Sequence, residues 1–360
     1  MNLQTEKYYD KVRVSCMTFN HASYIIDTMN GFCMQQTSFP FVCTIFDDFS
    51  TDGEQEVIKQ YVKENFDLED QGVVRNEETD DYVLSFARHK TNHNCFFAVY
   101  YLKYNHYSIG KSSRKNDYCK KFTEQVKYIA LCEGDDYWTD PYKLQKQVDY
   151  MEAHPECGLI YSDFCIFHQN TQEMERDMIK SGRRSQINSF EEHLSKAAYI
   201  APPSWLYRKD SIAVEEHNKN KGFVDGSFSL ALEFFKHSQV FFINETTCVY
   251  RVLDNSASHH TSPYKRYLYA KNVFEEQLYF GSKYDVNPDI LKRIRQKFYR
   301  KYYAQILSYE EQEQKRLLKL ESKSFDPSSF NTWAIKNVLS SSILTSLFTQ
   351  ICNIWYPKMN

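Results

Sequence analysis

One segment of the chain joins an apolar run to three closely spaced carboxylates. Residues 128–132 are apolar and β-prone, and Glu133, Asp135 and Asp136 follow directly, with one glycine between them. Open α/β sheets bind their ligands at the carboxyl ends of buried strands, where these side chains are expected to lie. Oxygen ligands suit Mg²⁺ or Mn²⁺ better than zinc, and Mg²⁺ is usually shared between carboxylates and a substrate phosphate. The segment therefore predicts a divalent-metal site, although glycine and aspartate are also common in turns that bind nothing.

A second acidic cluster follows another apolar run nearer the N-terminus. Residues 41–46 have the pattern of a buried strand and lead into the turn 47–53, and a further short strand is expected at 12–17. Helical patterns follow these two strands, at 24–36 and 54–65. Strand, helix, strand and helix in this order predict a βαβ unit and a parallel sheet, with polar groups gathered at one edge.

Four segments occur in an order that is typical of one enzyme family. They are the strand end Met17-Thr18-Phe19-Asn20, the turn Asp47-Asp48-Phe49-Ser50-Thr51-Asp52-Gly53, the cluster Glu133-Gly134-Asp135-Asp136, and the pair Tyr250-Arg251 followed by 255–259. Through them the chain resembles family 2 glycosyltransferases, which are inverting enzymes, and residues 133–147 are similar to one bacterial subgroup in particular. The resemblance covers roughly residues 10 to 260 and implies the α/β fold of that family, GT-A: a Rossmann-like mixed sheet flanked by helices.

The resemblance also implies which residues hold the nucleoside of a nucleotide-sugar donor. Thr18, Phe19 and Asn20 would line the pocket for the base and the ribose. Asp48 would accept a hydrogen bond from the imide of a uracil ring, with Ser50 as a further donor contact. The favoured donor is therefore a UDP-sugar.

The same resemblance implies a DXD-type metal motif that serves the diphosphate. Asp135 and Asp136 would bind Mn²⁺ or Mg²⁺, and Glu133 stands where the family often has Asp. Arg251 would reach the diphosphate, and Arg88 lies in a region that often touches the base. Independently of the resemblance, a divalent cation would stabilise the negative charge that develops on a departing nucleoside diphosphate.

Inversion needs a general base on the acceptor side. The resembling family places this base in a second acidic motif near the start of a helix, and the position that matches it here is Asp225, just ahead of the apolar helix expected at 228–237. Aspartate is also a common helix cap, so Asp225 can serve in either role or in both. Glu233 is a second acidic candidate within that helix, where an acceptor-site or a structural role is expected. Trp205, just before the strand expected at 206–208, would stack on an acceptor sugar or lie in the core.

The length of the chain allows one large domain with an appendage. We expect a GT-A domain over 1–262, with a donor half at about 1–165 and an acceptor half at about 190–262. The region 263–360 is expected to be a helical extension, and the polar stretch 103–121 an inserted loop with solvated cations.

The C-terminal region has two features that predict peripheral membrane contact. Residues 292–301 carry a basic cluster interleaved with apolar residues, and 338–356 mix apolar and polar residues over nearly a spanning length. A solvated helical hairpin would explain the basic cluster equally well. Ten cysteines without a CxxC pair, and the absence of a secretory signal, predict reduced thiols and a cytoplasmic location, extending to the inner face of the membrane.

These features favour an enzyme that acts on a glycan or lipid-linked acceptor in bacterial surface polysaccharide biosynthesis. A net charge of −3 and a pI near 6.4 argue against a nucleic-acid partner. Two alternatives remain: a sugar-nucleotide nucleotidyltransferase, and a non-catalytic glycan-binding or scaffold protein on a degenerate transferase fold. The first usually carries a Gly-rich phosphate loop after its first strand, and none is present between Met17 and Tyr24.

Overall fold

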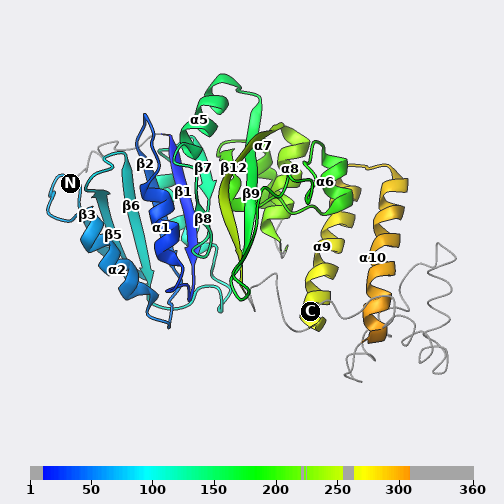
Figure 1. Ribbon diagram of the computed structural model, residues 1–360, viewed down its shortest axis with the longest axis horizontal. Coiled ribbons are helices and arrows are strands. Elements are labelled where there is room, and N and C mark those ends of the chain that lie inside the picture. The colour runs from blue at the N-terminus through cyan, green and yellow to red at the C-terminus, as the bar shows by residue number, and fades with distance from the viewer. Residues whose placement is uncertain (1–10, 220–222, 224, 254–262, 309–360) are drawn as a thin grey trace. The chain divides into compact units, whose positions relative to one another are not determined.

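The computed structural model describes residues 11–219, 223, 225–253 and 263–308, and Figure 1 shows their helices and strands. The stretches 255–259 and 338–356, on which two of the expectations depend, lie outside the described residues. The chain forms two compact units that alternate along the sequence. The first comprises Met1–Asn188, Tyr199–Asn220 and Glu233–Leu253, and the second Ser189–Ala198, Lys221–Leu232 and Asp254–Asn360.

The described part of the first unit contains a mixed sheet of twelve strands. In spatial order the path is β3 (Phe66–Asp67), β5 (Tyr82–His89), β6 (Cys95–Leu102), β2 (Phe41–Asp47), β1 (Val12–Thr18), β7 (Tyr128–Leu131), β11 (Leu206–Arg208), β9 (Cys157–His168), β12 (Gln239–Val252) and β8 (Tyr137–Trp138), while β4 (Arg75–Glu78) pairs with β5 and β10 (Glu173–Glu175) with β9. Strands β6, β2, β1 and β7 run parallel, and β5 runs antiparallel to β6. The prediction of a mixed α/β sheet flanked by helices is confirmed.

The βαβ unit predicted at the N-terminus is present. Helix α1 (Ile25–Cys33) follows β1, and α2 (Glu54–Asn65) follows β2 with the bounds expected from its periodicity. The two helices lie side by side on one face of the sheet (Figure 1). Because β1 and β2 are parallel and in register, both strands end at the same edge of the sheet.

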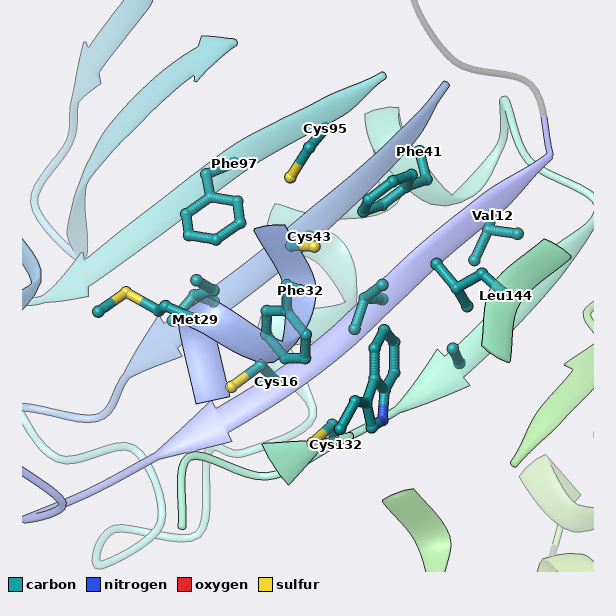
Figure 2. Packing of buried hydrophobic residues seen from close by; sticks show 14 of the residues in the cluster. Val12, Cys16, Met29, Phe32, Phe41, Cys43, Cys95, Phe97, Cys132 and Leu144 are labelled. Carbon is teal, nitrogen blue, oxygen red and sulfur yellow. The ribbon is translucent and has the colours of Figure 1, made fainter. Parts of the chain in front are cut away.

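Alternating residues of the central strands fill two apolar cores, one on each face of the sheet. On the helix-covered face, Cys16, Cys43 and Phe97 pack with Met29 and Phe32 of α1 (Figure 2). On the other face, residues of β5 and β6 pack beneath Phe122. The nine cysteines in the described residues are all unpaired.

The stretch 103–121, expected to be a solvated loop, is in part helical. Helix α3 (Arg114–Tyr118) and α4 (Lys120–Thr123) form there because Cys119 and Phe122 are buried against the second core. Lys115 is also buried, at 6% exposure, whereas Lys120 and Lys121 are exposed as expected.

Helix α5 (Lys143–Ala153) is fastened to the short 3₁₀ turn η1 (Pro202–Ser204) by buried side chains. Lys143 donates from Nζ to the carbonyl oxygen of Trp205 at 3.3 Å, and Gln147 donates from Nε2 to that of Ser204 at 2.8 Å. Lys143 has no carboxylate within ion-pair distance in the described chain, and its ammonium lies 4.4 Å from the Trp138 ring centroid. Burial lowers the pKa of Lys143 from 10.5 to about 8.

This lysine predicts a pH-dependent stability. Between about pH 8 and 10.5 the unfolded chain holds the Lys143 proton and the folded chain does not, so raising the pH favours folding. Relative to Lys143→Met, the wild type should gain up to about 3 kcal/mol of unfolding free energy across this range. Denaturant titrations of both proteins at pH 7.5 and 10.5 measure the difference, with the exposed Lys120→Met as control. Parallel pH profiles of wild type and Lys143→Met would contradict the prediction.

The second unit contains α6 (Phe190–Lys196), α9 (Pro263–Lys283), α10 (Pro288–Ser308) and the first part of α8 (Gly226–His237). The rings of Phe274 and Phe298 stack at 4.0 Å between α9 and α10, and α10 begins at Pro288, a residue favoured in the first turn of a helix. Over the described residues, which also include α7 (Ile212–Lys219) of the first unit, no helix is long and apolar enough to cross a membrane.

Candidate active site

The polar ends of β1, β2 and β7 meet at one edge of the sheet. Thr18 and Asp47 are register partners on β1 and β2, and β7 ends at Leu131 beside Ser15 of β1. The acidic turn 133–136 follows β7 directly, so both acidic clusters lie at the carboxyl edge where open sheets bind ligands.

The acidic turn is held tightly against β1 and α1. Gly134 donates from its backbone N to the carbonyl oxygen of Met17 at 3.0 Å. The buried Thr28 hydroxyl of α1 lies 2.9 Å from the carbonyl oxygen of Gly134 and 2.6 Å from that of Asp136. A Cβ atom at position 134 would lie 2.0 Å from Thr18 Oγ1 and 2.4 Å from Thr18 Cβ, so only glycine fits this close approach.

Gly134→Ala should therefore displace the turn or the end of β1. We expect a loss of about 1–3 kcal/mol of unfolding free energy, because the added methyl group meets a branched side chain that cannot move away. Thermal unfolding tests this, with Gly226→Ala as the matched control, because a Cβ there meets nothing within 4 Å. Equal stability of Gly134→Ala and wild type would contradict the expected collision.

The two aspartates of the turn differ in their surroundings. Asp136 is 3% exposed and accepts a hydrogen bond on Oδ1 from the backbone N of Arg251 at 2.8 Å. Burial, followed by the charge of Asp135, raises the pKa of Asp136 well above its usual range. Asp135 is half-buried, with Oδ2 3.9 Å from Nε2 of His21, and Glu133 is exposed. The turn thus presents two adjacent carboxylates, and the ionised form of Asp136 is energetically unfavourable there.

Arg251 fixes the turn from β12. Its Nε donates to the carbonyl oxygen of Asp135 at 2.8 Å, and its terminal nitrogens donate to Gln169 at 2.7 Å and to Asp27 at 2.8 Å. Its guanidinium carbon also lies 4.8 Å from the Tyr24 ring centroid. The structure therefore brings Arg251 to the acidic turn as a buried positioning group, and its expected contact with a diphosphate stays a prediction.

The loops after β1 and β2 are braced against each other. Asn20 donates from its backbone N to Ser50 Oγ at 2.9 Å and accepts from the backbone N of Thr51 at 2.8 Å. Glu54, at the start of α2, accepts from the hydroxyl groups of Thr18 and Ser50 and from the backbone N of His21. Burial raises the pKa of Glu54. Thr18, Asn20 and Ser50, all expected at the donor site, therefore lie together.

Asp48 is buried beneath the segment that follows β6. Its oxygens accept from the backbone N of His106 at 2.8 Å and of Tyr107 at 3.1 Å, and Lys115 Nζ lies 2.9 Å from Oδ2. A carboxylate offers about four acceptor positions, so these three contacts leave room for one more donor. The expected bond from a uracil imide stays a prediction that these contacts permit.

Three further residues expected at the site also lie in the first unit. Arg88 pairs in register with Phe96, near the start of β6, so it lies at the opposite edge of the sheet from Asp47, and its guanidinium pairs with Asp70 at 2.9 Å. Trp205 is 1% exposed and Glu233 is fully buried, with His237 Nε2 3.4 Å from its carboxylate. The structure thus places Arg88 away from the acidic turn, whereas Trp205 directly precedes Leu206, the register partner of Ala130, and so lies near the end of β7.

Asp225 belongs to the second unit and caps α8. Its Oδ1 accepts from the backbone N of Phe228 at 3.0 Å and from the Ser227 hydroxyl at 2.6 Å. The Tyr269 hydroxyl of α9 donates to Oδ2 at 2.7 Å. The capping role is thus present, and the role of general base stays a prediction.

Comparison with known proteins decides the fold. No protein-family model matches the chain. Uncharacterised proteins of Mycobacterium tuberculosis (Rv1520) and Mycobacterium bovis (Mb1547) are each 30% identical over 154 residues, which is 43% of this chain and only 35% of theirs.

S. aureus TarS 1-349 in complex with UDP superposes with a TM-score of 0.56 at 13% identity, over 97% of this chain and 92% of that one. The complex of TarS 1-349 with UDP-GlcNAc gives 0.53 at 14% identity, over 96% and 91%. TarS is a GT-A glycosyltransferase. This chain has a GT-A fold.

A divalent cation fits the acidic turn of this GT-A fold. Two neighbouring carboxylates disfavour each other's charge, and burial raises the pKa of Asp136 further, so a cation beside Asp135 and Asp136 would relieve both effects. Across the described ranges no three His, Cys, Asp or Glu side chains converge in a metal-binding geometry. Mg²⁺ needs only one or two carboxylates when substrate phosphates complete its coordination, so the pair suffices.

Two polar residues that organise the carboxyl edge of the sheet were not expected from the sequence. Thr28 holds the acidic turn from α1, and Glu54 joins the loops after β1 and β2. The available signal was weak, because both residues read as ordinary positions of amphipathic helices. Only the contact between distant segments shows that their side chains point at the carboxyl edge.

Proposed function

We propose that this chain transfers a sugar from a nucleoside-diphosphate donor, with UDP-sugars favoured, to a glycan or lipid-linked acceptor with inversion at the anomeric carbon. The observation that carries the proposal is the pair Asp135 and Asp136 at the carboxyl edge of a GT-A sheet, with the pKa of Asp136 raised by burial. Such a pair is costly to a fold unless it binds something positive.

At the diphosphate end, Asp135 and Asp136 would hold Mg²⁺ or Mn²⁺. When bound, the cation supplies Lewis-acid stabilisation of the charge on the departing diphosphate. Arg251 and Thr28 keep the turn in place through its backbone, so the carboxylates need not reorganise during the reaction. Exposed Glu133 would make an outer contact at the metal.

At the nucleoside end, the proposal uses the braced loops after β1 and β2. Asp48 would accept a hydrogen bond from a base N–H, and Thr18, Phe19 and Asn20, together with Ser50, would surround the base and the ribose. Glu54 supports this role, because it fixes Thr18, His21 and Ser50 through one carboxylate.

At the acceptor end, Asp225 would remove the proton from the attacking hydroxyl group. The cap to Phe228 and the bond from Tyr269 orient its carboxylate, as a general base requires. Because Trp205 and Glu233 are buried, they would contribute to acceptor binding by shaping that region of the protein.

We further propose that the acceptor belongs to surface polysaccharide biosynthesis and that the protein meets it at an anionic membrane surface. Support comes from α10, where Lys292, Arg293 and Lys297 are exposed and each can add about 1 kcal/mol of attraction to such a surface. Co-sedimentation with vesicles containing anionic lipid, but not with neutral vesicles, is the expected result. Equal recovery in both supernatants would count against the membrane contact.

The enzymatic proposal is tested by the products formed from UDP-, GDP- and dTDP-sugars with Mn²⁺ and an oligosaccharide acceptor mixture. A glycosyltransferase releases nucleoside diphosphate, and NMR of the new linkage should show inverted anomeric configuration. A nucleotidyltransferase would instead form pyrophosphate from a nucleoside triphosphate and a sugar phosphate. A scaffold protein would release neither product.

A further inference from the structure

An exposed aromatic side chain at the carboxyl edge is held on a strained backbone. Phe49 has φ of +65°, and it is the only aromatic residue in the described ranges with φ in the left-handed region. Left-handed backbone is costly for residues with a side chain and is usually given to glycine or asparagine. Phe49 is also 46% exposed, so burial of its side chain in the protein offsets little of this conformational cost.

The residues on both sides of Phe49 impose its conformation. Asp48 donates from its backbone N to the carbonyl oxygen of Thr18 at 3.0 Å, and its carboxylate is bound by the backbone of His106 and Tyr107. Ser50 donates from its backbone N to Asp47 Oδ1 at 3.1 Å. Strained residues persist only where their surroundings fix them in this way, and they cluster at ligand sites.

The position of Phe49 in the sheet points to a particular part of a nucleotide. Strand β2 lies beside β1, and β7 with the acidic turn lies on the far side of β1, so two strand spacings, about 10 Å, separate the ends of β2 and β7. A nucleoside diphosphate whose phosphates meet Asp135 and Asp136 would extend across β1 toward β2. Phe19, 41% exposed, follows β1 between these two ends.

We propose that Phe49 is a ligand-contacting residue that packs its ring against the nucleobase of the donor. The inference rests on the proposed function and adds to it a second aromatic group beside Phe19. Every base has a flat π-face, and stacking on a protein aromatic contributes to binding whatever the base. Strain at residue 49 is then the cost of holding a ring where the base arrives.

The test compares Phe49→Asn with Phe49→Tyr in calorimetric binding and thermal unfolding. Asparagine tolerates the left-handed region, so Phe49→Asn should raise Tm by about 2–4 °C while it weakens UDP binding about 5- to 100-fold. Uridine monophosphate should lose the same factor, and pyrophosphate with Mn²⁺ should bind unchanged. Phe49→Tyr keeps a ring on the strained backbone and should match the wild type in both measurements.

Leu68→Asn is the matched control, because Leu68 is 42% exposed and has no left-handed backbone. It should change neither Tm nor UDP affinity. Unchanged UDP binding in Phe49→Asn, with a wild type that binds UDP, would overturn the inference alone. A lower Tm in Phe49→Asn would also overturn it, since the ring would then be structural. A wild type that binds no nucleotide would overturn the proposed function itself.

Discussion

Asp136→Asn is expected to abolish metal-dependent donor binding and to lower turnover by about 10³-fold or more. The carboxylate contributes half of the charge that would hold the cation, and Lewis-acid stabilisation supplies several kcal/mol to the leaving diphosphate. Asparagine has nearly the same shape and can still accept from the backbone N of Arg251 through Oδ1. The local structure should therefore survive the change.

The stability of the same variant should move in the opposite direction from its activity. Burial and Asp135 raise the pKa of Asp136, so ionised Asp136 destabilises the fold at neutral pH and its amide does not. Thermal unfolding without metal should show Asp136→Asn as stable as the wild type or more so. The exposed Asp149→Asn on α5 is the control and should change neither property. Full turnover in Asp136→Asn would contradict the metal assignment.

Asp225→Ser is expected to keep donor binding and to lose about 10²- to 10⁴-fold in transfer rate. Serine caps helices about as well as aspartate, so the bond to the backbone N of Phe228 can be kept while the base is lost. Asp225→Asn should behave in the same way. Single-turnover transfer and UDP binding, measured on each variant, separate chemistry from binding.

Removal of the hydroxyl that binds Asp225 provides the matched comparison. Tyr269→Phe leaves the carboxylate but takes away the donor that orients Oδ2, so transfer should persist at a reduced rate. If Asp225→Ser transferred sugar at the wild-type rate, Asp225 would be a helix cap alone and the base would have to be sought elsewhere.

Much of the fold could be predicted where a pattern is local. The apolar strand β2 and the periodicity of α2 each appear within a short window. Strand β6, an equally buried apolar run, was not assigned from the sequence, because no acidic turn follows it as one follows β2. The two short helices within 103–121 were missed because burial of Cys119 and Phe122 overrides a polar composition.

In the candidate site, too, the residues with a local sequence pattern could be predicted and those placed by long-range contacts could not. Asp135 and Asp136 stand out in the sequence because they end an apolar strand together. The residues that position them, Thr28 and Arg251, lie more than a hundred positions away along the chain, and only the folded sheet brings them together. Arg88 shows the reverse case: its place in the sequence pointed to the base, but the antiparallel direction of β5 carries it to the opposite edge.

The central claim is that the carboxyl edge of this sheet binds a nucleoside diphosphate through a metal held by the acidic turn. The most direct measurement is calorimetric titration of UDP and UDP-sugars into the wild type and Asp136→Asn, each with and without Mn²⁺. We expect binding to the wild type that depends on Mn²⁺ and is lost in Asp136→Asn. Equal affinity with and without Mn²⁺, or no binding of any nucleotide to folded wild type, would contradict the claim.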